Sequence, residues 1–440
     1  MDPLEIPNPA DIQVGIDSSK ASIPSFLYDL FSAYYHLYTC PSVARLVATQ
    51  ARKLVDVSNS LQAWHASPYG LGGLRFVDSH SLTCVREIWK CWSRFDGQDN
   101  HDHDQNDPAI AGLKAKFEEN LKAIRRVQLD QRVDNTGGRG LCYTAVRSAA
   151  PAADLDMPRA VNEVHQRFWR EGRITTRSEE DTQEINPMFV TPESDGQVRM
   201  HWGLDPLLGF PLAEAFMTTK IEPIVRSAPE EIAALVKAVL YAIVPFYLWC
   251  QSFQQAWEKR NVVMRWFVGD AIAFGHALQG LAKGASRLTH WYRTRHSFMP
   301  LRIDGEDYRP ESLTPAPLSF MVIDTSNLID DLGALNVLMA TSPLLENNLA
   351  ATIFTEMLTR YHHTYKEEAD NLLCGPLPTV ALLLGLVCVE HSTNTSPYPG
   401  ASHDAMTYHW LKTKSALPRD MPKRLYHTYE RLRWKRPMAH

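Results

Sequence analysis

The sequence lacks an apolar run long enough to cross a lipid bilayer. Its longest such run, residues 238 to 250, covers 13 residues and contains Pro245, whereas a spanning helix needs about 20 apolar residues. The N-terminus starts with acidic residues and lacks the basic segment followed by an apolar one that is typical of a secretory signal. These absences predict a cytoplasmic protein without a membrane span.

The sequence is also poor in cysteine patterns and in glycine-rich loops that hold cofactors. Its seven cysteines are scattered and form no Cys-x-x-Cys pair, which predicts reduced thiols. The glycine-rich segments 70–73 and 137–140 match neither a Walker loop nor a Rossmann fingerprint. The His-Asp-His-Asp run at 101–104 lacks the dispersed further ligands of a zinc site. We therefore expect no cofactor and no metal.

What the sequence does contain is the composition of a globular protein. It has 440 residues, of which 45% are hydrophobic and 22% charged. This length is enough for two or three domains, or for one large α/β unit with insertions. Helical periodicity is widespread, and a strand, tight turn and helix follow one another twice, over 262–278 and over 320–339. We predict a helix-rich α/β fold with a Rossmann-like core sheet and extensive helical elaboration.

The pattern along the chain predicts four parts. They are an irregular N-terminal arm (1–25), a helical region (26–130), an α/β core with helical insertions (131–400) and a basic C-terminal tail (401–440). A hairpin is expected around the turn Ser194-Asp195-Gly196. A long helix is expected over 229–259, with a bend near Pro245.

The predicted tail is strongly basic, in contrast to the rest of the chain. Residues 411–440 hold nine Lys or Arg against two acidic residues, a net charge of +7, which leaves −12 for the first 410 residues. Such a segment is a plausible RNA-binding surface, or else a solvated terminal helix that docks on the acidic body of the protein. The predicted RNA-binding residues are Lys423, Arg424, Arg431, Arg433, Lys435 and Arg436.

Acidic residues follow the two predicted strands. Asp270 and Asp324 lie at the carboxyl ends of these strands. In open α/β sheets this is the position at which ligands bind. A carboxylate there can receive a guanidinium group through two parallel hydrogen bonds. The alternative is structural: both aspartates would be helix N-caps, and Asn327 would be a turn residue.

Other polar residues near strand ends extend this candidate site. Ser326 would accept an acyl group if a base took its proton, although the Gly-x-Ser-x-Gly elbow is absent and a capping hydroxyl is the alternative. Glu390, followed by His391, would act as an acid or base, or lie at the boundary of the core. The predicted catalytic residues are Ser326, Asn327 and Asp324, and the predicted substrate-binding residues are Asp270, Asp330, Asp331, Asp205 and Glu390.

Several segments together resemble one protein family along residues 26 to about 395. They are Trp64-His65-Ala66-Ser67-Pro68-Tyr69-Gly70, the run 201–210, Val268-Gly269-Asp270-Ala271, residues 322–338 and Leu382-Leu383-Leu384-Gly385-Leu386. They resemble the central region of large fungal proteins that often end in a MYND zinc finger, whose N-terminal part resembles the methyltransferase-like dynein axonemal assembly factors. The glycine-rich methyltransferase segment and the zinc finger of that family are missing, which argues against methyl transfer.

By size, architecture and charge the chain also resembles the fungal arginine-containing cyclodipeptide synthases. This resemblance implies a partner, aminoacyl-tRNA bound by the basic tail, and an amino acid-derived substrate whose arginyl group enters an acidic pocket. The activated ester would supply the driving force, so that no nucleotide-binding loop is needed. The alternatives are a non-catalytic protein-interaction module with a degenerate methyltransferase-like core, and a small-molecule transferase of another type.

Overall fold

The computed structural model describes residues 25–95, 108–130, 157–173, 184–192, 198–199, 243, 246–312, 314–359, 365–394 and 428–437. The chain forms two compact units, each assembled from segments that are distant in sequence. Unit 1 comprises 1–74, 83–264 and 406–418, and unit 2 comprises 75–82, 265–405 and 419–440. Asp205, Lys423 and Arg424 lie outside the described residues, so the predictions for them stay predictions.

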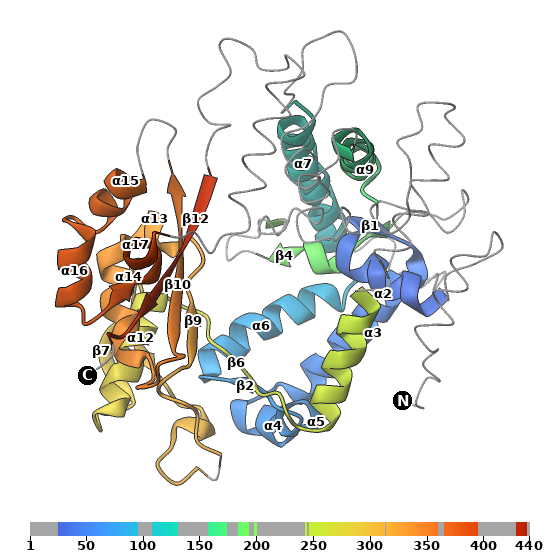
Figure 1. The fold of residues 1–440 in the computed structure, drawn as a ribbon. Coiled ribbons are helices and arrows are strands. Elements are labelled where there is room, and N and C mark those ends of the chain that lie inside the picture. The colour runs from blue at the N-terminus through green and yellow to red at the C-terminus, as the bar shows by residue number, and fades with distance from the viewer. Residues whose placement is uncertain are drawn as a thin grey trace. The chain divides into compact units, whose positions relative to one another are not determined.

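Unit 1 is mainly helical among its described residues (Figure 1). Residues 41–66 form two helices, because Ser60 caps a new helix by accepting the N–H of Ala63 at 3.0 Å. Residues 246–258 are helical, within the range of the predicted bent helix. The elements are α2 (Ser25–Tyr35), β1 (Tyr38–Thr39), α3 (Pro41–Val57), α4 (Leu61–Ala66), α5 (Pro68–Leu71), α7 (Pro108–Asp130), α9 (Met157–Glu171), β3 (Glu184–Ile185), β4 (Thr191–Pro192) and β5 (Val198–Arg199).

The predicted hairpin around residues 194–196 is confirmed with shifted strands. β4 and β5 pair antiparallel, with Thr191 opposite Arg199. The first strand was expected at residues 188–190, but residues 187–189 form a 3-10 turn, because Pro187 opens it and the Asn186 side chain accepts the N–H of Met188. The chain passes between the two units in α6 (Ser79–Trp92) and in the paired strands β2 (Leu74–Phe76) and β6 (Met264–Trp266).

Unit 2 contains both predicted strand, turn and helix segments. The first is β6 followed by α12, and the second is β9 followed by two short helices that meet at Gly333, where φ is +83°. The helices and strands of this unit are α12 (Ala271–Ala282), β7 (Leu288–Thr294), β8 (Ser297–Arg302), β9 (Val322–Asp324), α13 (Leu328–Leu332), α14 (Ala334–Thr341), β10 (Thr352–Thr359), α15 (Tyr365–Leu372), α16 (Leu377–Leu383), β11 (Val387–Cys388), α17 (Val389–Thr393) and β12 (Thr428–Lys435).

A four-stranded sheet in the order β11-β12-β10-β9 forms the centre of unit 2. β10 pairs parallel with β9 and antiparallel with β12, which also pairs antiparallel with β11. The sheet is therefore mixed. The helix-rich α/β class is confirmed, but the described part of the chain contains no parallel Rossmann-like sheet.

The two faces of this sheet differ, because successive side chains of a strand point to opposite sides. Ile353 and Met357 of β10 and Leu432 and Trp434 of β12 are buried with side chains of α13, α14, α15 and α16, and these helices lie on one side of the strands (Figure 1). The alternate residues of the same strands, Phe354 and Arg431 among them, lie on the opposite, partly exposed face. A helical layer and a sheet layer thus enclose this core, and a second cluster of buried residues lies between α12 and β8.

No helix in the described ranges is both long enough and apolar enough to cross a membrane. The six cysteines in the same ranges carry free thiols.

Candidate functional site

A cavity of about 280 Å³ lies in unit 2 where the N-terminus of α12 meets β7 and β8. We call it the Asp270 pocket. Its volume is below the range of about 300 to 1,000 Å³ typical of small-molecule sites, so it suits a group the size of an amino acid rather than a dinucleotide. It is lined by Asp270, Ile272, Ala273, Trp291, Tyr292, Thr294, Arg295, Phe298 and Asn336.

Asp270 caps a helix, which is one of the two roles that the sequence left open, and its side chain also lines the pocket. Its Oδ1 atom accepts the N–H of Ala273 at 3.0 Å and caps α12, while its side chain lines the pocket. Its Oδ2 atom lies 3.7 Å from Nε of Arg295, too far for a good hydrogen bond. The side chain of Arg295 is 57% exposed and that of Asp270 17%, so this long contact is weak and leaves Oδ2 within reach of a ligand cation.

Aromatic side chains form much of the remaining wall. Tyr292 and Phe298 meet edge to face with ring centroids 5.7 Å apart. Trp291 stacks on His276 of α12, with centroids 4.7 Å apart and an angle of 12° between the rings. Flat rings beside a carboxylate suit a planar cation, since the face of an aromatic ring attracts positive charge.

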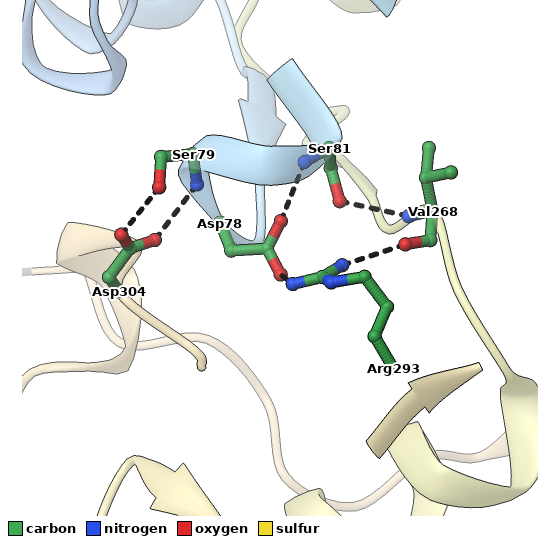
Figure 2. A network of polar contacts seen from close by, with 6 residues as sticks. All are labelled: Asp78, Ser79, Ser81, Val268, Arg293 and Asp304. Atoms are coloured by element: carbon green, nitrogen blue, oxygen red, sulfur yellow. Dashed lines mark hydrogen bonds and ion pairs between the residues drawn. The ribbon is translucent and has the colours of Figure 1, made fainter. Parts of the chain in front are cut away.

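Arg293 holds in place the loop that presents Asp270 (Figure 2). Its Nη1 atom donates to the carbonyl of Val268 at 2.7 Å, and its own backbone carbonyl accepts the N–H of Asp270 at 2.7 Å. The guanidinium lies over the ring of Phe267, 5.2 Å from its centroid. Arg293, a buried residue of β7, therefore positions residues 267 to 270 through both its side chain and its backbone carbonyl.

The charge of Arg293 is matched by Asp78, and both side chains are almost completely buried. Asp78 pairs with Nη2 of Arg293 through Oδ2 and accepts the N–H of Ser81 through Oδ1 at 2.7 Å. The Ser81 hydroxyl in turn accepts the N–H of Val268 at 2.9 Å. Figure 2 shows this closed network, which joins the start of α6 to the loop before α12.

Two titratable groups beside the network have shifted pKa values. Burial lowers the pKa of His80, the charge of Arg293 lowers it further, and Asp78 acts in the opposite direction. Burial raises the pKa of Tyr308 to about 12, against the effect of Arg265. Both groups are neutral at pH 7, so the charge balance of the network rests on Asp78 and Arg293.

Asp324 lies at a different place, on the partly exposed face of the four-stranded sheet. Its Oδ1 atom accepts the N–H of Ser326 at 2.9 Å, and its Oδ2 atom pairs with Nη2 of Arg431. The Arg431 guanidinium lies over the ring of Phe354, 4.5 Å from its centroid, and 3.8 Å from Glu356. Asp324 thus stabilises a turn rather than capping a helix, and it already binds an arginine of its own chain.

The neighbours of Asp324 do not line the Asp270 pocket either. Ser326 has φ of +48°, and its hydroxyl lies 3.4 Å from the side-chain oxygen of Asn327, which is an amide and not a base. Asn327 precedes α13 without a side-chain capping bond, and Asp330 and Asp331 follow in the first turn. The structure therefore does not bring Asp270 together with the 324–331 cluster, contrary to the expected common crevice.

Glu390 is engaged with β12. It is buried at the start of α17, where it accepts the backbone N–H of Arg433 at 2.6 Å and Nε of the same residue at 2.7 Å. The Cys388 thiol lies 3.7 Å from its carboxylate. This arrangement makes Glu390 part of the packing of the sheet edge.

The described cations of the predicted tail are used inside unit 2. Arg431 and Arg433 pair with Asp324 and Glu390, Lys435 donates to the carbonyl of Leu349 at 3.2 Å, and Arg436 donates to that of Leu345 at 2.8 Å. Residues 428–435 are a strand between β10 and β11. The alternative of a solvated terminal helix is therefore wrong for residues 428–435.

Sequence reasoning missed the β7 and β8 hairpin, which supplies most of the pocket wall. The strand β7 carries no apolar alternation that could be recognised, because its buried residue is Arg293 while Trp291 and Tyr292 are exposed. The connection Arg295-His296 also contains none of the Gly, Asn or Asp residues by which such turns are recognised.

Among the residues described, no group of three or more His, Cys, Asp or Glu side chains is placed to hold a metal ion. Comparisons of the sequence with protein-family models, with curated proteins and with solved structures found no match.

Proposed function

We propose that the chain is a tRNA-dependent cyclodipeptide synthase whose Asp270 pocket takes the arginyl group of an aminoacyl-tRNA. The observation that carries the proposal is the pocket itself, in which a carboxylate lies among aromatic rings with one exposed guanidinium beside it. The end of arginyl-tRNA has the matching charges, a cationic side chain and a nearby phosphate. In this assignment Asp270 receives the guanidinium of the substrate, and Arg295 faces the phosphate.

The size and shape of the pocket support the same assignment. A cavity of about 280 Å³ admits an arginyl side chain but excludes the nucleotides of the tRNA body. The rings of Tyr292 and Phe298 offer apolar surface for the methylene groups and faces for the planar cation. Asp324 is not used in this assignment, because Arg431 already occupies it.

The reaction needs neither an oxidant nor a nucleotide triphosphate. The α-amine of one aminoacyl group attacks the ester carbonyl of the other, a peptide bond forms, and the ester bond to the tRNA ribose breaks with the proton passing to the released hydroxyl. The second amine then attacks the remaining ester in the same way and closes the six-membered ring. Two aminoacyl-tRNAs thus yield one diketopiperazine and two free tRNAs.

Exchanging Asp270 for Asn tests the proposal without removing the helix cap, because Asn caps helices about as well as Asp. A charge-assisted hydrogen bond contributes about 1.5 to 3 kcal/mol, so Asp270→Asn should reduce the yield of arginine-containing diketopiperazines by about 10- to 100-fold. The measurement is mass spectrometry of extracts from a heterologous host that expresses the full chain.

Two further variants serve as matched controls. Asp331→Asn removes an exposed carboxylate of α13 that does not line the pocket, and its yield should equal that of the wild type. Asp324→Asn should also retain product, since the proposal does not place the substrate there. Loss of product with Asp324→Asn but not with Asp270→Asn would move the arginyl site to the sheet, and folded wild-type protein that makes no diketopiperazine would refute the synthase.

The second candidate is a non-catalytic protein-interaction module. It is favoured by the apolar surface of α16, where Leu382 and Leu383 are 73% and 81% exposed, since contiguous exposed apolar residues mark interaction sites. The expression experiment separates the two candidates, because an interaction module produces no diketopiperazine.

A further inference from the structure

We propose that the β7 and β8 hairpin binds single-stranded RNA, with bases stacked on its exposed rings and phosphates held by its cations. The inference deepens the proposed function and rests on it in one respect, namely that the RNA is the single-stranded acceptor end of a tRNA. We call the outward residues of the hairpin and its flanks the hairpin surface. They are the half-buried Arg287 and the exposed residues Lys283, Leu288, Tyr292, Arg295, Phe298, Met299 and Arg302.

The hairpin exposes large apolar side chains to an unusual degree. Phe298 is 88% exposed, Leu288 54% and Tyr292 50%. A folded domain rarely leaves such a group of residues uncovered unless the surface binds something. Tyr292 and Phe298 present open ring surface, and every base has a face that stacks on such rings.

The charge of this segment is of one sign. Residues 283–302 contain five Lys or Arg and no Asp or Glu, in a chain whose net charge is −5. Arg293 is buried against Asp78, and Asp270 lies 3.7 Å from Arg295. Lys283, Arg287 and Arg302 are then the cations that can contact phosphates. The surface as a whole is complementary to a polyanion.

The hairpin is also held as a rigid platform. A two-stranded hairpin is marginal on its own, but here Leu301 is completely buried, Arg293 closes the Asp78 network, and Trp291 stacks on His276 of α12. Because the hairpin is anchored at these three residues, its backbone loses little conformational freedom when a base binds.

The position of the hairpin surface relative to the pocket fits one end of an RNA strand. Tyr292, Arg295 and Phe298 belong to both, because they line the Asp270 pocket as well. A strand that stacks its last bases on these rings brings the group esterified to its terminal ribose to the mouth of that pocket. A second copy of this chain is a poor occupant, because two surfaces of the same positive sign repel each other.

The test measures RNA binding directly, apart from catalysis. The probe is a fluorescein-labelled single-stranded RNA of about 12 nucleotides ending in CCA, within the range of site sizes known for single-strand binders, and the readout is fluorescence anisotropy. The double variant Tyr292→Ala/Phe298→Ala in the full chain should bind at least about tenfold more weakly than the wild type. The matched control Leu382→Ala/Leu383→Ala removes equally exposed apolar groups from α16 and should bind like the wild type.

The cations give a second, independent readout. Arg287→Gln/Arg302→Gln should reduce the slope of log affinity against log salt concentration by about 1.4, since each phosphate contact to a single strand contributes about 0.7. Circular dichroism verifies that all variants are folded, which is expected because the altered rings are exposed.

Several outcomes would overturn the inference. They are unchanged RNA affinity in the ring variant, loss of RNA binding only in Lys423→Gln/Arg424→Gln, and hairpin-dependent binding to phosphatidylserine vesicles without binding to RNA. The proposed function is judged separately: diketopiperazine production with hairpin-independent RNA binding refutes only the inference, whereas hairpin-dependent RNA binding without any product refutes only the synthase.

Discussion

Asp78→Ala is expected to destabilise unit 2 by about 3 to 5 kcal/mol, since removal of one member of a buried ion pair leaves the other charge uncompensated. Asp78 is 1% exposed and Arg293 4%. The variant leaves the Arg293 guanidinium without its carboxylate partner and also removes the acceptor for the N–H of Ser81. The midpoint of urea unfolding, followed by circular dichroism, measures the loss.

The matched control is Lys366→Gln, which breaks an exposed pair with Asp370 on α15. Surface pairs of this kind contribute about 0 to 1 kcal/mol, so its unfolding midpoint should remain near that of the wild type. The double variant Asp78→Leu/Arg293→Met removes both charges and replaces them with apolar groups. It should recover part of the stability lost in Asp78→Ala, and equal loss in the two variants would show that the network stabilises through hydrogen bonds alone.

The same network links stability to the pocket. Arg293 is a positioning residue, because it touches Val268 and Asp270 through hydrogen bonds but does not line the cavity. In the double variant the loop before α12 loses its bond to the guanidinium while Asp270 itself is intact. We therefore expect weaker binding of arginine methyl ester, measured by calorimetry, even when the protein is folded.

Trp434→Ala should cost about 3 to 5 kcal/mol of stability, the usual range for removing a large aromatic side chain from a core. Trp434 is 1% exposed, on a strand paired on both sides, and its Nε1 atom donates to Thr355 Oγ1 at 3.0 Å. Because Thr355 is completely buried, the variant also leaves a hydroxyl without this partner. Urea unfolding again measures the change.

Trp434→Phe is the companion variant, since it keeps most of the apolar volume and loses only the hydrogen bond and part of the ring. It should cost clearly less than Trp434→Ala. Equal and small effects of both variants would mean that β12 is not part of the core of unit 2.

This second prediction changes how C-terminal deletions are interpreted. If residues 411–440 were a separate tail, their removal would weaken RNA binding and leave the fold intact. Because residues 428–435 lie between β10 and β11, removal takes out an inner strand and exposes the apolar face that Leu432 and Trp434 cover. Lost RNA binding in such a deletion therefore reports unfolding of unit 2, and single charge changes are the better test.

Local patterns were sufficient for features that depend on neighbouring residues. The sequence predicted a helix beginning at Asp270, because an apolar periodicity follows an N-cap residue, and α12 begins there. The hairpin near residue 195 was predicted for a similar reason. In each case the hydrogen bonds that define the element join residues a few positions apart, so a short stretch of sequence is enough to predict it.

The tertiary structure alone decided which charges are available for a ligand. Arg431 pairs with Asp324 across 107 positions, and Asp78 pairs with Arg293 across 215. A cation paired with a distant carboxylate and a cation exposed to solvent look the same in a sequence. Strand pairing and ion pairing between remote segments depend on how the whole chain folds back on itself, and for that reason only the coordinates separated the arginines of β12, which stabilise the sheet, from those of the hairpin surface.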